Sequence, residues 1–82
     1  MITLKYPLQK LYILASNYKI AEYTMRELNL DRHMVTLTAN IDCLRGISNV
    51  DIIVNTFNLS SRTIDMLNII KMYNVELHYI TT

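Results

Sequence analysis

The 82-residue sequence has one cysteine, one proline, one glycine and no tryptophan. A lone Cys43 cannot form an internal disulfide, which is typical of a protein from a reducing compartment. The two histidines and the cysteine lie too far apart in the sequence for a zinc site. No apolar run approaches the roughly 18 residues of a membrane span, and the first residues lack the pattern of a secretory signal. We expect a cytoplasmic protein that binds no metal or other cofactor and does not enter a membrane.

The sequence also lacks a cluster of charge of one sign. Its net charge is +1, with eight basic and seven acidic residues spread along the chain, so we expect no nucleic-acid partner. By contrast, 51% of the residues are hydrophobic. A chain of this length buries only about 60–65% of the surface that its unfolded form exposes. Self-association would stabilise it further, and we predict a homo-oligomer.

Four segments have the length and apolar pattern of β-strands. Two of them are apolar at odd and even positions alike, which is typical of central strands covered on both faces. The other two alternate apolar and polar residues, as edge strands do. The central segments are 10–15 and 50–54, and the edge segments are 33–39 and 75–81.

Helical periodicity lies between these strands. It predicts a helix over 18–28, with Asn17 as its N-cap, and another over 61–73, with Ile64 among its inward-facing residues. Residues 40–46 are expected to form one or two short helical turns that end at the single glycine.

Alternation of strands and helices predicts an α/β fold with a parallel sheet and right-handed crossovers. Placing the two central strands inside gives four strands in the order 2-1-3-4, as in Rossmann-like and flavodoxin-like domains. We predict one small three-layer domain over 1–82, with one helix on one face and two on the other. Residues 1–9 are either an extra edge strand or an arm over the face that one helix cannot cover. The exposed remainder of that face is the predicted self-association surface.

Ligands of open parallel sheets bind beyond the carboxyl ends of the strands. Small polar residues follow each predicted strand at this rim. The candidate ligand-binding residues are Ser16, Asn17, Asn40, Arg45 and Asn55, with Arg45 as the contact for an anionic group. The same residue types cap helices and close turns without any ligand. The rim is therefore either a small-molecule cleft or a set of caps.

The scarcity of glycine weighs against phosphate binding. Nucleotide-binding α/β domains place glycines after the first strand, where bare N–H groups approach a phosphate. Here residues 15–19 read Ala-Ser-Asn-Tyr-Lys, and the only glycine is Gly46. The pattern Gly-x-x-x-x-Gly-Lys-Ser/Thr is also missing from the sequence.

Catalytic groups are not evident either. Neither Asp42 nor Asp51 is expected at the rim, and no serine has a histidine placed to activate it. His33 and His78 are expected to be surface or half-buried structural residues. Cys43 is expected to be a small buried hydrophobe, with a reactive thiol as the alternative. We predict no catalytic residues and a protein that is not an enzyme.

One segment resembles a known family. Residues 43–54 read Cys-Leu-Arg-Gly-Ile-Ser-Asn-Val-Asp-Ile-Ile-Val and resemble the Leu-Arg-Gly turn and Walker B strand of P-loop ATPases such as phage terminases and helicase-like motors. Residues 13–17 and the following helix resemble the strand and helix after the P-loop helix of those enzymes. Residues 79–82 resemble the strand end that couples the ATP state to nucleic acid. Asn55-Thr56 stands where the family has Asp-Glu, a change that removes magnesium binding and water activation. The resemblance implies a truncated ATPase-like sheet without a P-loop, as in small phage proteins.

These observations favour a non-enzymatic protein-interaction module, a small phage accessory protein that acts as a homo-oligomer. A host protein is a second class of partner, and the host cytoplasm is then the compartment. The alternative is a module that binds a small molecule or nucleotide at the polar rim without hydrolysing it.

Overall fold

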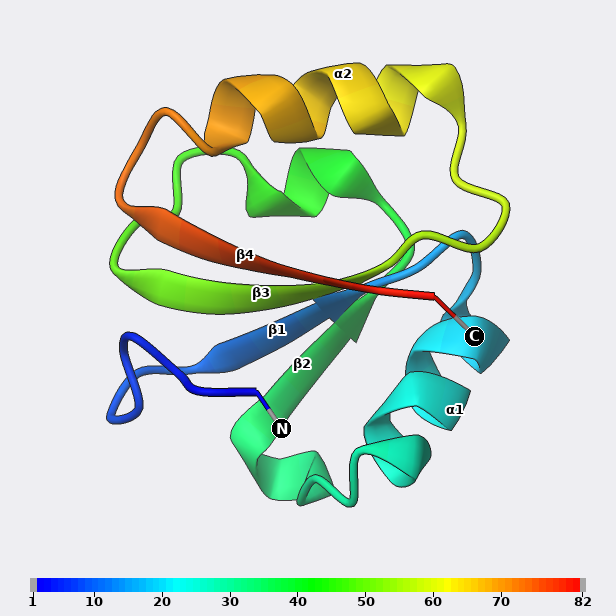
Figure 1. Cartoon of the computed structure of the whole chain (residues 1–82), viewed down its shortest axis with the longest axis vertical. Helices are drawn as coiled ribbons and strands as arrows, with labels where there is room; N and C mark the ends of the chain where they lie inside the picture. The colour runs from blue at the N-terminus through cyan, green and yellow to red at the C-terminus, as the bar shows by residue number, and fades with distance from the viewer. Residues whose placement is uncertain (1, 82) are drawn as a thin grey trace.

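The computed structural model describes residues 2–81. Within them the chain forms a single sheet with helices on both of its faces (Figure 1). The elements are β1 (Leu11–Leu14), α1 (Tyr18–Glu27), the 3₁₀ helix η1 (Arg32–Met34), β2 (Val35–Thr38), the 3₁₀ helix η2 (Ile41–Leu44), β3 (Val50–Asn55), α2 (Ser61–Ile70) and β4 (Val75–Ile80).

The four strands are parallel and lie in the order β2-β1-β3-β4, which confirms the predicted fold class and strand order. β3 is buried along all six of its residues, because helices or the chain's N-terminal segment cover both of its faces. β2 and β4 are the edges, and their alternating sequences leave several of their side chains half-exposed. Apolar residues at both odd and even positions thus identify the central strands, as expected.

Two hydrophobic clusters lie on opposite faces of the sheet. On one face, α2 and η2 pack on the side chains of Ile52 and Val54. On the other face, α1 packs on Ile13 and Ile53. Figure 1 shows α2 and η2 together on one side of the strands and α1 on the other. The predicted distribution of one helix against two is therefore confirmed.

The segment before β1 forms an arm, since residues 2–10 contain no strand. Its side chains Ile2 and Leu4 join the cluster of α1, alongside Ile53 and Ile80. The arm therefore lies on the half of this face that α1 leaves free. The surface predicted to mediate self-association is in part covered by the chain's own first residues.

Several element boundaries differ from the sequence prediction, most of them by one residue. β2 begins two residues late, because Asp31 caps a 3₁₀ turn over Arg32–Met34. α2 ends at Ile70, and Ile64 is 48% exposed, so its predicted inward orientation is wrong. Three residues turn an α-helix through about 300° rather than a full 360°. The side chain of Ile64 is therefore rotated by about 60° around the helix from the buried side chain of Leu67.

Candidate functional site

Two of the candidate ligand-binding residues at the carboxyl ends of the strands cap helices. Asn17 Oδ1 accepts a hydrogen bond from the N–H of Ile20 at 2.9 Å and begins α1. Asn40 Oδ1 accepts one from the N–H of Asp42 at 3.0 Å and begins η2. Both side chains thus have the role that asparagine takes at helix starts without a ligand.

Two further candidates point into the protein. Asn55 is fully buried, and its Nδ2 donates to Thr24 Oγ1 of α1 at 2.8 Å. Its Oδ1 accepts from the N–H of Phe57 at 3.0 Å. Ser16 Oγ is also buried and has no hydrogen-bond partner within residues 2–81. Neither side chain presents a polar atom to a ligand at the surface; Asn55 instead ties β3 to α1.

Asn55→Ala tests this structural role. We expect the free energy of unfolding to fall by about 2–3 kcal/mol, because the N–H of Phe57 and the Thr24 hydroxyl lose a buried partner. For a domain of this size that corresponds to a melting temperature lower by roughly 10–20 °C in thermal unfolding followed by circular dichroism. Asn68→Ala on the exposed side of α2 is the matched control. An Asn55→Ala protein as stable as this control would contradict the role.

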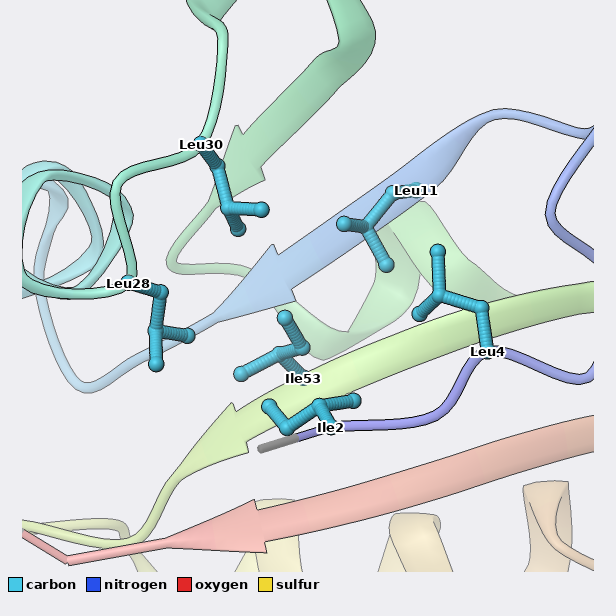
Figure 2. A pocket seen from close by; sticks show the side chains of 6 residues that line it. All are labelled: Ile2, Leu4, Leu11, Leu28, Leu30 and Ile53. Atoms are coloured by element: carbon cyan, nitrogen blue, oxygen red, sulfur yellow. The ribbon is translucent and has the colours of Figure 1, made fainter.

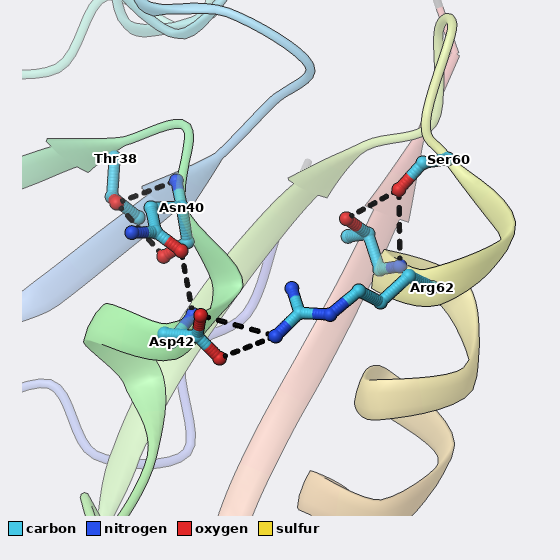
Figure 3. Close-up of polar contacts among 6 residues, drawn as sticks. Thr38, Asn40, Asp42, Ser60 and Arg62 are labelled. Atoms are coloured by element: carbon cyan, nitrogen blue, oxygen red, sulfur yellow. Dashed lines mark hydrogen bonds and ion pairs between the residues drawn. The ribbon is translucent and has the colours of Figure 1, made fainter.

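Polar contacts at the rim also join η2 to α2 (Figure 3). Arg62 Nη2 lies 3.0 and 3.1 Å from the two carboxylate oxygens of Asp42. Thr38 Oγ1 accepts from the N–H of Asn40 at 3.1 Å, and Ser60 Oγ caps α2. The Asp42–Arg62 pair is exposed and contributes about 1 kcal/mol or less. The pair links the first turn of α2 to η2.

The fifth candidate, Arg45, lies in a different place. It follows η2 and lines a groove of about 600 Å³ between the η2–β3 connection and the carboxyl-terminal half of α2. None of the other candidate residues lines this groove. The lining residues are Leu44, Arg45, Gly46, Ile47, Ser48, Met66, Ile69, Ile70 and Tyr73.

The groove is mainly apolar, and two of its lining side chains are exposed: Ile69 of α2 is 50% exposed, and Tyr73, which follows the helix, 65%. The adjacent Met72 is 81% exposed. Arg45 is its only charged lining residue. The other three arginines of the sequence lie within 4 Å of a carboxylate, whereas Arg45 makes no ion pair within residues 2–81. The groove thus combines an apolar floor with a cation that is unpaired within residues 2–81.

A contact that the sequence did not predict involves Asp51 of β3, which is 1% exposed. Its carboxylate oxygens accept from the N–H groups of Lys5 and Tyr6 at 2.9 and 2.8 Å. The ring Nε2 of His78 on β4 lies 2.8 Å from Oδ1. Groups of the arm and of the neighbouring strand β4 therefore contact both oxygens of this carboxylate. The sequence held one signal for this contact, a carboxylate within an otherwise apolar central strand. Because a buried charge requires hydrogen-bond donors, such a residue indicates that other segments reach it.

The electrostatics of Asp51 follow from these contacts. Burial raises the pKa of the carboxyl, but the hydrogen bond of His78 and the N–H groups of Lys5 and Tyr6 outweigh it, so the pKa lies below its ordinary value. Asp51 is therefore a charged group that holds the arm. A substrate would have to displace the arm to reach it.

Beside the arm lies a small cavity of about 220 Å³ (Figure 2). It is lined by Ile2, Leu4, Leu11, Leu28, Leu30 and Ile53. Figure 2 shows these aliphatic side chains directed toward one another from the arm, β1, β3 and the segment after α1. With no polar side chain in its lining, the cavity has no group that would orient a polar ligand.

Within residues 2–81, no three His, Cys, Asp or Glu side chains gather in a way that could hold a metal ion. Over the same part of the chain, neither helix has both the length and the apolar character needed to cross a membrane. Comparison with known proteins gives no match to a protein-family model, a curated protein or a solved structure. The resemblance of residues 43–54 to P-loop ATPases therefore stays a prediction.

Proposed function

We propose that this chain is a non-catalytic protein-interaction module that acts as a homo-oligomer, and that its contact surface is the groove beside α2. The observation that carries the proposal is that exposed apolar side chains, those of Ile69 and Tyr73, line this groove, with the exposed Met72 next to Tyr73 in the chain. Contiguous apolar surface of this kind is typical of binding sites on soluble proteins. The groove replaces the sheet face beside α1 as the expected interface, because the arm lies on that face.

The rim gives less support to the alternative, a site for a small molecule or nucleotide. The side-chain oxygens of Asn17, Asn40 and Asn55 accept hydrogen bonds from the chain's own backbone. Arg45, the proposed contact for an anionic group, lines the groove with α2. A role as a phage accessory protein with a host partner rests only on the resemblance of residues 13–17, 43–54 and 79–82 to P-loop ATPases.

The mass of the protein at several concentrations tests the proposal. The chain has a mass of 9.6 kDa. For a weak, transient interface we expect a dissociation constant of about 1–100 μM. Sedimentation velocity and native mass spectrometry across that range should show a species of integral multiple mass that grows with concentration. A 9.6 kDa monomer at every concentration would contradict the proposal.

A further inference from the structure

Most homo-oligomers are closed by two-fold axes, and a two-fold interface must be complementary to itself. An apolar centre with charges of opposite sign on either side of it meets this condition. The groove supplies the apolar centre at Ile69 and the cation at Arg45. A matching anion is on α2. Asp65 precedes Ile69 by four residues, so the two side chains lie one above the other on the helix.

We propose that a second copy of this chain occupies the groove, with the two α2 helices antiparallel about a two-fold axis near Ile69. Asp65 of each copy then forms an ion pair with Arg45 of the other. This inference rests on the proposed function and names its partner and geometry. With the axis near Ile69, which is close to the end of α2, Asp65 of one copy lies beside the end of the mate's helix. Arg45 lines the groove at that end, together with Ile70 of α2 and Tyr73 after it.

The charges of the isolated chain support this pairing. Neither Arg45 nor Asp65 makes an ion pair or a side-chain hydrogen bond to another residue of the 2–81 segment. By contrast, Arg62 on the same flank of α2 is engaged by Asp42. Apolar contacts around Ile69 and Tyr73 would supply most of the affinity. The two symmetric ion pairs would select the antiparallel register, since charges at an interface determine orientation more than strength.

Charge reversal tests the register directly. Arg45→Glu places two carboxylates in each proposed pair, and Asp65→Arg places two cations there. We expect each variant alone to dimerise at least tenfold more weakly than the wild-type protein, as measured by sedimentation equilibrium. When the two variants are mixed, every proposed pair again joins opposite charges. We therefore expect a heterodimer in native mass spectrometry, with a dissociation constant within about threefold of the wild-type value.

Lys71→Glu is the matched control, because it reverses an exposed charge just after α2 on the flank away from the groove; it should dimerise like the wild-type protein. Circular dichroism checks that each variant is folded.

If Arg45 and Asp65 paired only within one chain, mixing the variants would not restore association, and the inference would be overturned. Unchanged dimerisation of both single variants would overturn the register, while the proposed function would stand if a dimer is still present. A wild-type monomer would overturn both.

Discussion

Asp51→Ala should lower the free energy of unfolding at neutral pH by about 3–5 kcal/mol, the usual cost of removing one partner from a buried charged network. The N–H groups of Lys5 and Tyr6 and the ring of His78 would lose their acceptor. A domain of this length has a total stability of roughly 4–12 kcal/mol, so the loss is a large fraction of it. The arm should detach, because its two backbone hydrogen bonds to β3 end at this side chain.

Urea unfolding measures the stability loss, and amide hydrogen exchange at Lys5 and Tyr6 measures the release of the arm. Asp42→Ala is the matched control, because it removes a carboxylate from an exposed ion pair and should change stability by about 1 kcal/mol or less. Protected Lys5 and Tyr6 amides in the Asp51→Ala protein would contradict the role of this carboxylate in holding the arm.

The same network predicts a dependence on pH. The folded-state pKa of Asp51 lies below the ordinary value of 3.8, so the unfolded chain binds a proton at this group more readily than the folded one. The contribution of Asp51 to stability is therefore present above that value and is lost as the pH falls through the folded-state pKa. The difference in stability between the wild-type protein and Asp51→Asn should shrink as the pH is lowered below 3.8.

Ile69→Asp has the second large expected effect, a weakening of self-association by at least about 100-fold. At the proposed interface the new carboxylate would lose water without gaining a donor, and central apolar contacts often account for 2 kcal/mol or more of binding. The isolated chain should tolerate the change, because Ile69 is already 50% exposed. Sedimentation equilibrium measures the dissociation constant.

Asn68→Asp is the control for this variant, since it adds the same charge to the neighbouring position on the other flank of α2. It should associate like the wild-type protein. If Ile69→Asp also associates like the wild-type protein, the contact lies elsewhere. The unpaired edge of β4 would then be the next surface to test.

Much of the fold followed from the sequence because local pattern and tertiary position agree for β1 and β3. Residues 50–54 have apolar side chains at odd and even positions, which indicates a central strand. Placing the two central strands inside the sheet then gives the strand order. The arm was ambiguous, because Ile2 and Leu4 alternate with polar residues as an edge strand would. The contacts that hold the arm, such as the N–H groups of Lys5 and Tyr6 on Asp51, join residues more than 40 positions apart, which no local pattern shows.

The candidate site was less predictable for the same reason. Asn17 and Asn40 follow strands, and their capping roles are local enough to be anticipated as the alternative. The position of Arg45 depends on how η2 packs along α2, which no local pattern specifies. Asp51 was placed correctly at the start of a strand. Its importance depends on the arm and on His78, neither of which is near it in the sequence.

The groove beside α2 is the proposed contact surface of this protein. Two-dimensional ¹H–¹⁵N NMR spectra of the wild-type protein, recorded through a dilution series across the association, test it most directly. We expect concentration-dependent shifts to concentrate in residues 44–48 and 65–73, with the rim residues Ser16, Asn17 and Asn40 unchanged. Shifts confined to the rim, to the arm or to β4 would contradict the claim.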